Sequence, residues 1–331
     1  MVLMARKFGN RFVLFICVVM VTWFFLFHGV REEKLTLTGL LDFTHQNEII
    51  RPKPFIAVPH RKRNEYSVRS IVVMVLSKAS NILQREVIRK TWGNPRSQME
   101  YNFSVYFLLG REDSVNVKDD NGDIVQVDVI ENYLNLTDKT VAAFNWVVQF
   151  CHRASYFFKV DDDVFLELDI FNEIQNNADY LPDDVILGSC SQMSLPCRKS
   201  GKWQVSYEEY PFVRYPPFCN GPGYVMTYKT TRRIHEEMKK TRIFKFEDVY
   251  VGMVAYRLGL SVKNMKKFVY NSNVYIYDWL LSDLFSRCHT ITHYATPDIV
   301  QKLWEQRETI GRNKTDCSPW GIAFFLLSYI V

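Results

Sequence analysis

The sequence predicts an α/β fold with a mainly parallel central sheet. Apolar runs of strand length recur along the chain, at residues 71–76, 103–109, 124–129, 156–160 and 185–188. Helical patterns fall between several of these runs, at residues 85–92, 136–151 and 168–177. Three consecutive carboxylates, Asp161, Asp162 and Asp163, directly follow one predicted strand. Strand and helix alternation of this kind indicates a parallel sheet, in which ligands bind beyond the carboxyl ends of the strands.

Each predicted element has a local reason. Residues 71–76 form a continuous apolar run, which is typical of a strand buried on both faces. The helix at 85–92 is expected to stop at Gly93 and Pro95, and the one at 136–151 carries an apolar stripe that includes Val141 and Phe144. Residues 215–224 are rich in proline and glycine and predict a turn that enters a strand.

The acidic run at the end of residues 156–160 predicts a cation site. Adjacent carboxylates in apolar surroundings are tolerated only when a cation neutralises them. The alternation of a strand places Asp161 and Asp163 on one side and turns Asp162 away. Oxygen ligands suit Mg²⁺ or Mn²⁺ bound to the phosphates of a substrate. The alternative is an acidic surface turn, which the flanking Phe and Val residues make less favoured.

The N-terminus predicts a membrane anchor. Residues 12–30 are almost entirely apolar and follow Arg6, Lys7 and Arg11, so we expect one transmembrane helix with a cytoplasmic tail at residues 1–11. A cleaved signal peptide is the alternative, but no small-residue cleavage site follows the run. Everything after residue 30 would then be luminal or extracellular.

Three further observations fit that topology. Glycosylation sequons begin at Asn102, Asn135 and Asn313. Six of the seven cysteines lie outside the membrane run, an even set for an oxidising compartment whose pairing is not predicted. The net charge is +5, but residues 1–69 hold eleven Lys and Arg against five Asp and Glu, so the rest of the chain is nearly neutral. That distribution argues against nucleic-acid binding.

The remaining chain divides by composition. Residues 31–66 are polar and punctuated by prolines, as expected of a stem that tethers a domain to the membrane. Residues 67–321 suffice for one large catalytic domain. Residues 322–331 form an apolar tail, too short to span a bilayer, for which no role is predicted.

Other residue patterns suggest site chemistry, each with a plainer alternative. Arg85 and Arg89 stand four apart on one helical face and could bind phosphates, although surface arginines are common. Glu247 and Asp248 form a second acidic pair, which could supply a general base or cap a helix through residue 258. His293 could complete a divalent-cation site or be purely structural.

Taken together and in this order, the segments resemble the β1,3-galactosyltransferase family. The resemblance covers about residues 70–304. It rests on residues 85–93 (REVIRKTWG), 135–140 (NLTDKT), 158–165 (FKVDDDVF), 202–203 (KW), 209–211 (EYP), 215–221 (YPPFCNG), 247–252 (EDVYVG) and the segment around His293. The chain departs from the family's usual residues at Asn220, Pro222, Gln204 and Asp138, which weakens the assignment of the substrate.

The resemblance implies a GT-A-type, Rossmann-like domain of an inverting Golgi type II transferase. Such an enzyme would move a hexose from a UDP-sugar to a hydroxyl, O3 in most cases, of an acceptor glycan on a glycoprotein or glycolipid. Galactose is the favoured donor sugar and N-acetylglucosamine the alternative. A silent sugar-binding relative and a metal-dependent phosphoesterase are the other classes considered.

The resemblance also implies roles for single residues. Mn²⁺, or Mg²⁺, would be held by Asp161, Asp163 and His293. Asp248 is the expected general base and Glu247 the rival. The nucleotide side would involve Arg85, Arg89, Lys159, Asp161 and Asp162.

Overall fold

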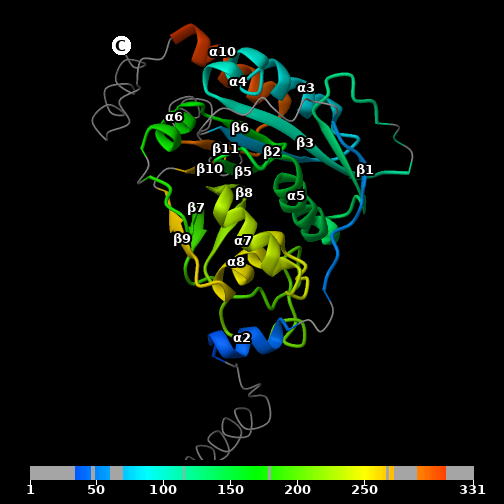
Figure 1. The fold of residues 1–331 in the computed structure, drawn as a ribbon, viewed down its shortest axis with the longest axis vertical. Helices are drawn as coiled ribbons and strands as arrows, with labels where there is room; N and C mark the ends of the chain where they lie inside the picture. Colours follow the sequence, from blue (N-terminus) through cyan, green and yellow to red (C-terminus); the bar gives the residue numbers. More distant parts are fainter. Residues whose placement is uncertain are drawn as a thin grey trace, which may run out of the picture. The chain divides into compact units, whose positions relative to one another are not determined.

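The computed structural model describes residues 34–45, 49–59, 70–113, 115, 117–177, 180–265, 268–271 and 289–310. The chain forms two compact units. One comprises Met1–Thr36 and Ser194–Tyr215, and the other comprises Leu37–Met193 and Pro216–Val331. The larger unit holds every helix and strand named below (Figure 1).

The central sheet of the larger unit has eight strands. Their spatial order is β1 (Phe55–Ala57), β4 (Ile124–Ile130), β3 (Phe103–Arg111), β2 (Ile71–Ser77), β5 (Tyr156–Asp161), β8 (Phe218–Thr227), β7 (Val185–Ser191) and β9 (Ser261–Asn264). The neighbouring pairs β4–β3, β3–β2 and β2–β5 are parallel. β8 is antiparallel to both its neighbours, and β1 is antiparallel to β4. The prediction of a mostly parallel α/β sheet is therefore confirmed.

A second, three-stranded sheet lies next to the acidic run. It consists of β10 (Val269–Asn271), β11 (Ile291–His293) and β6 (Val164–Leu166). β6 begins directly after Asp163, and β11 pairs with it antiparallel, with His293 opposite Val164. This pairing is what joins the C-terminal part of the chain to the end of β5.

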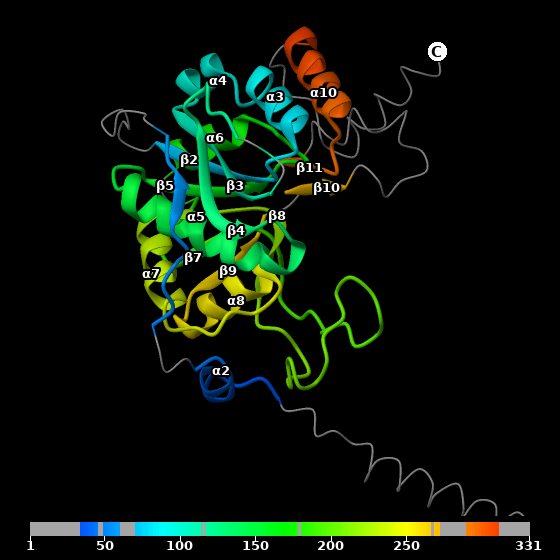
Figure 2. The same ribbon diagram turned by 90° about the vertical axis from the view of Figure 1, so that its right-hand side faces the viewer.

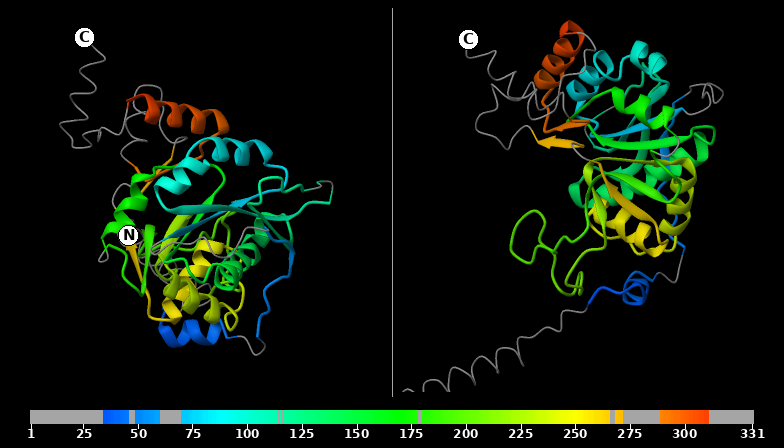
Figure 3. Two further views of the ribbon diagram at one scale, coloured as in Figure 1. Left: turned by 45° about the horizontal axis from the view of Figure 1, so that its top comes forward. Right: turned by 90° about the vertical axis from the view of Figure 1, so that its left-hand side faces the viewer.

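Helices cover both faces of the central sheet (Figures 1 and 2). One face carries α5 (Leu136–Phe150), α7 (Tyr228–Met238) and α8 (Glu247–Arg257). The other carries α3 (Ile82–Lys90), α4 (Pro95–Glu100), α6 (Asp169–Asn176) and α10 (Pro297–Ile310). α10 lies beside α3 and α4 in both views of Figure 3.

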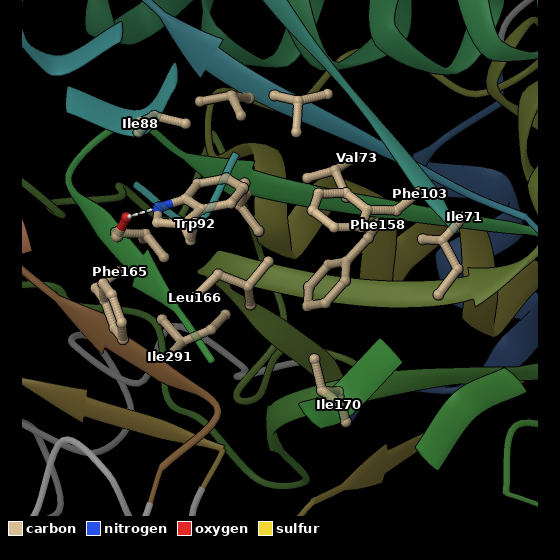
Figure 4. Close-up of a cluster of buried hydrophobic side chains, with 14 of the residues drawn as sticks. Ile71, Val73, Ile88, Trp92, Phe103, Phe158, Phe165, Leu166, Ile170 and Ile291 are labelled. Atoms are coloured by element: carbon tan, nitrogen blue, oxygen red, sulfur yellow. Dashed lines mark hydrogen bonds between the residues drawn. The ribbon is translucent and has the colours of Figure 1, made fainter. Parts of the chain in front are cut away.

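The core under α3, α6 and α10 explains why β2 is apolar throughout. All seven residues of β2 are buried, and Ile71 and Val73 point into this core with Phe103 and Phe158 (Figure 4). Trp92 is fully buried there and donates its indole N–H to the carbonyl of Val164 at 3.1 Å. That bond fastens β6, and with it the turn that carries the aspartates.

The segment predicted as a stem contains regular structure. Residues 31–66 include α2 (Leu37–Phe43) and the edge strand β1. Arg257 at the end of α8 donates to the hydroxyl of Thr44 at 2.5 Å, and so fastens the end of α2 to α8. The stem and its boundary at residue 67 stay predictions, and the structure adds that the segment carries α2 and β1.

The strand predicted to follow the turn at residues 215–224 is present but begins earlier than expected, because β8 starts at Phe218 and runs through the glycines. They permit close packing instead of a turn. A Cβ on Gly223 would lie 2.5 Å from the side chain of Ile291. The disulfide Cys190–Cys219 joins β7 to β8 beside a register shift in their pairing.

The membrane predictions fall mostly outside the described residues. These predictions are the tail at 1–11, the anchor at 12–30, the apolar tail at 322–331 and the sequon at Asn313. Where the structure describes the chain, it contains no helix long and apolar enough to cross a membrane.

In the smaller unit, residues 194–215 form a loop that is held by its own contacts. Arg198 donates to the carbonyls of Ser206 and Phe212, at 2.9 Å each, and its guanidinium lies 4.0 Å from the ring centre of Tyr207. Trp203, the aromatic residue of the KW motif, is 57% exposed. The loop thus presents an indole to solvent on a fixed backbone.

Gly252 in α8 offers a test of the packing between this helix and β8. Replacing an ordinary helical glycine by alanine stabilises a protein by about 1 kcal/mol. A Cβ on Gly252, however, would lie 2.4 Å from the Cβ of Phe218 and 2.8 Å from the carbonyl of Pro217. We expect Gly252→Ala to lower the free energy of unfolding by about 2–3 kcal/mol, measured by urea titration.

Gly122→Ala is the matched control, since Gly122 has a φ of +65° but nothing within 4 Å of the added Cβ. It should cost only about 1 kcal/mol of backbone strain. A Gly252→Ala protein as stable as the native one would show that α8 can move away from β8 freely.

Candidate active site

The acidic run lies at the carboxyl edge of the central sheet. Asp161 is the last residue of β5, which pairs with β2 on one side and β8 on the other. Asp162 and Asp163 form the turn into β6. Because β5 is central and its neighbours bury it, this turn is presented at a fixed position.

The structure brings together the three residues predicted as metal ligands. One ligand atom from each of Asp161, Asp163 and His293 lies within 4.8 Å of the other two. His293 Nε2 is 3.5 Å from Asp163 Oδ2, and the amide of Ala295 donates to the carbonyl of Asp163 at 2.9 Å. Two carboxylates and one imidazole form a donor set suited to Mn²⁺ or Mg²⁺.

The charge balance also fits a cation. Burial, together with the charges of Asp161 and Asp162, raises the pKa of Asp163 to about 7. Lys159 opposes the shift, but its positive charge does not offset burial and the two neighbouring carboxylates. A divalent cation at this group would supply the further positive charge.

Asp162 points away from the ligand group, as strand alternation predicts. Its Oδ2 accepts a hydrogen bond of 2.8 Å from Asn81, which precedes α3. Burial raises the pKa of Asp162, although hydrogen bonds from Ser77 and Asn81 oppose the shift. Asp162 therefore joins the acidic turn to the segment between β2 and α3.

Lys159 connects three elements beneath the ligand group. Its ammonium is fully buried and donates to Asp161 Oδ1 at 2.7 Å, to the carbonyl of Gly221 at 2.6 Å and to Glu247 Oε1 at 3.0 Å. Burial disfavours its charge, but the two carboxylates outweigh that effect and raise the pKa of Lys159. Since Asp161 Oδ1 is engaged by Lys159, Oδ2 is the oxygen left for a cation.

Glu247 is enclosed by donors. Besides Lys159, Tyr224 donates its hydroxyl to Oε2 at 3.2 Å and Thr140 donates at 3.3 Å. The residue is only 4% exposed, and burial raises its pKa to about 7 against the opposing charge of Lys159. A Cβ on Gly221 would lie 3.1 Å from Oε1, so glycine permits the close approach. Such a carboxylate cannot readily reach a substrate.

Asp248 is placed differently although it is the next residue. It is partly exposed, and its Oδ1 accepts a hydrogen bond of 2.8 Å from the amide of Val249 in the first turn of α8. Burial raises its pKa, and the charges of Lys159 and Asp161 are close enough to influence it in opposite directions. Of the two acidic residues, Asp248 is the one with access to an incoming group.

The predicted nucleotide arginines contact the protein itself. Arg85 is 4% exposed and donates to the hydroxyl of Ser77 at 3.1 Å and to the carbonyls of Lys78 and Ala79. Arg89 binds Asp123 through two hydrogen bonds of 2.9 and 2.7 Å. Arg85 thus shapes the segment after β2 that holds Asp162, while Arg89 is held by Asp123. Their binding to a nucleotide stays a prediction.

The sequence reasoning did not single out Lys139, Thr140 and Tyr224 as site residues. Lys139 is buried, donates to the carbonyl of Ser77 at 2.6 Å and forms an ion pair with Glu131. A lysine within a predicted buried helix was a sequence signal that could have identified Lys139. Nothing in the local pattern distinguishes Tyr224 from an ordinary strand tyrosine.

These features define a class of site. It is a group of two carboxylates and one imidazole that could hold a divalent cation, at the carboxyl edge of an α/β sheet, with a partly exposed carboxylate at a neighbouring helix N-terminus. Open sheets of this type bind ligands at that edge.

The chain belongs to the galactosyltransferase family, whose family model, described as Galactosyltransferase, matches residues 83–266. It is 35% identical over 206 residues to the mouse (Mus musculus) protein named UDP-GalNAc:beta-1,3-N-acetylgalactosaminyltransferase 1, covering 58% of this chain and 61% of the relative. It is 32% identical over 257 residues to human beta-1,3-galactosyltransferase 5, covering 75% of this chain and 81% of the relative. The predicted family is confirmed.

Two further facts concern coverage. The chain spans about three fifths of the length of the N-acetylgalactosaminyltransferase relatives that it matches. A solved structure titled WbbM bifunctional glycosyltransferase, apo form, is 12% identical with a TM-score of 0.40, over 79% of this chain and 52% of that one.

Lys159 offers a test of the buried network. Lys159→Met would leave Glu247 buried beside no cation, and removing one partner of a buried pair costs about 3–5 kcal/mol. We expect a loss of that size in the free energy of unfolding, measured by urea titration. Lys229→Met is the control, because Lys229 pairs with Asp183 on the surface and should change stability by about 0.5 kcal/mol or less. Equal effects of the two substitutions would contradict the central position of Lys159.

Proposed function

We propose that the protein is an inverting hexosyltransferase that moves a hexose from a UDP-sugar to a hydroxyl of an acceptor glycan in a β linkage. The observation that carries this proposal is the group of Asp161, Asp163 and His293 with Asp248 beside it, in a chain of the galactosyltransferase family. O3 is the expected acceptor hydroxyl. We also propose a Golgi membrane location with the catalytic domain luminal, on the family resemblance and the predicted anchor.

The donor sugar is proposed to have the galactose configuration. The names of the relatives specify N-acetylgalactosamine for one group and galactose for the other, and these two sugars differ only at C2. Galactose is favoured, as the sequence resemblance implied. N-acetylglucosamine remains the alternative donor.

The ligand group would hold Mn²⁺ or Mg²⁺ through Asp161, Asp163 and His293. A cation bound there would stabilise the negative charge that develops on the departing UDP. Lys159 and Asn81 would hold the carboxylates of Asp161 and Asp162 in place throughout the reaction. These carboxylates are therefore held in position before the donor arrives.

Asp248 would act as the general base. It would accept the proton of the acceptor hydroxyl as that oxygen attacks the anomeric carbon from the face opposite UDP. A raised pKa brings a carboxylate closer to neutral pH and makes it a better base. One displacement of this kind converts an α-linked donor into a β-linked product, and no covalent intermediate with the enzyme is needed.

The first experiment measures UDP release by the full-length protein in detergent with Mn²⁺, a panel of UDP-sugars and a mixed set of glycoside acceptors. We expect acceptor-dependent release from UDP-galactose that chelation by EDTA abolishes and Mn²⁺ restores. Asp163→Ala should abolish release without unfolding the protein. Turnover of UDP-N-acetylglucosamine alone would assign the other donor. Binding of UDP without any turnover would favour a silent sugar-binding relative.

The choice between the two acidic residues has its own test. We expect Asp248→Asn to lower kcat about a hundred- to ten-thousand-fold, the usual contribution of a general base, with the thermal unfolding temperature preserved. Glu247→Gln should mainly lower stability, because it removes a charge partner of Lys159. Intact turnover in Asp248→Asn, together with its complete loss in folded Glu247→Gln, would show that Glu247 is the base.

A further inference from the structure

A second concave site lies on the face of the sheet that carries α3, α4 and α10. It is a pocket of about 600 Å³ whose walls come from α4, the start of α6 and the second half of α10. Figure 1 and both views of Figure 3 show α4 and α10 side by side. Neither the ligand group nor Asp248 contributes to the pocket, so the proposed reaction does not account for it.

The inner wall of this pocket is built from engaged side chains. Arg307 is 12% exposed, forms an ion pair with Glu167 and donates to the hydroxyl of Tyr101 at 2.8 Å. Asn94 accepts the amide of Ser97 at 2.9 Å and so fixes the start of α4. Because these side chains are held in place, the pocket is preformed, as ligand-binding sites usually are.

The outer wall carries groups that remain available. Arg96 and Glu308 are exposed and form no ion pair with any described residue. Trp304 is partly buried and presents an indole to the pocket. An aromatic face with a guanidinium and a carboxylate around it can pack against the C–H face of a sugar and hydrogen-bond its hydroxyls.

The charges of the lining select among polar ligands. Arg96 and Arg307 are balanced by Glu100 and Glu308, so the pocket has no formal net charge. An anionic ligand would be repelled by Glu100 and Glu308, and a cationic ligand would be repelled by Arg96. A neutral polyhydroxyl compound avoids both costs.

We propose that this pocket binds a neutral oligosaccharide, namely a part of the acceptor glycan remote from the reacting hydroxyl. This inference rests on the proposed function. Leu168 of the pocket is five residues after Asp163 in the chain, so their Cα atoms are at most about 18 Å apart. An oligosaccharide of a few sugar residues can bridge a distance of up to that size. The pocket would therefore select for acceptor length.

Binding is tested without catalysis. The full-length protein in detergent, free of UDP and divalent metal, is mixed with a neutral hexasaccharide of alternating galactose and N-acetylglucosamine, and saturation-transfer NMR is recorded. All proteins carry Asn102→Gln, so that no glycan of the chain's own is attached beside Tyr101. We expect transfer that is lost in Arg96→Ala and in Trp304→Leu and kept in Trp304→Phe, which retains an aromatic face. Arg232→Ala, an exposed arginine of α7, is the control.

Unchanged transfer in both Arg96→Ala and Trp304→Leu would overturn the proposal. The acceptor role is tested by kinetics with the same variants. Arg96→Ala should raise KM for the hexasaccharide about five- to ten-fold, leaving kcat and KM for a monosaccharide glycoside unchanged. Equal changes for both acceptors would exclude selection by length. Absence of turnover with every donor would refute the proposed function, and the NMR result would still decide whether the pocket binds saccharides.

Discussion

The site depends on the buried ammonium of Lys159. Removing such a charge from water is costly unless acceptors surround it, and here they come from three elements, β5, β8 and α8. Glu247, which supplies one of them, is itself buried and needs Tyr224 and Thr140 to complete its hydrogen bonds. Each of these groups is tolerable only because the others are present. The strand that carries the aspartates and the helix that carries Asp248 are therefore held in one arrangement.

The same network explains why three adjacent aspartates have three different surroundings. One oxygen of Asp161 accepts a hydrogen bond from Lys159, and Asp162, in the turn after β5, accepts one from Asn81. Asp163 has no comparable cation among the described residues, and its pKa is raised to about 7 by burial and by its two neighbours. The residue whose charge is least compensated is thus the one that lies next to His293. That imbalance is the physical reason to expect a divalent cation between them.

Much of the fold was predictable from the sequence, because the strands and helices are strongly patterned. The apolar run of β2, the stripe of α5 and the acidic end of β5 all predicted their elements and the edge of the sheet where the site lies. The turn predicted at residues 215–224 was made too long, because glycine marks close approach between elements as well as turns, and β8 packs tightly against Ile291. The partners of Glu247 were not predictable either. Thr140 and Tyr224 are 84 residues apart in sequence, and only the tertiary fold brings them to the same carboxylate.

The different surroundings of adjacent acidic residues follow from backbone geometry. The end of β5 at Asp161 and the turn that follows it separate Asp161 from Asp162, and a helix rotates successive side chains by about 100°, which separates Glu247 from Asp248. The second separation is useful only if α8 cannot rotate. It is fixed at its first turn by the contact of Glu247 with Lys159, and at its last turn by Arg257, which donates to Glu237 at 2.8 Å and to Thr44 at 2.5 Å. The N-terminal segment that contains Thr44 therefore helps to determine where Asp248 points, although it lies at the opposite end of the helix.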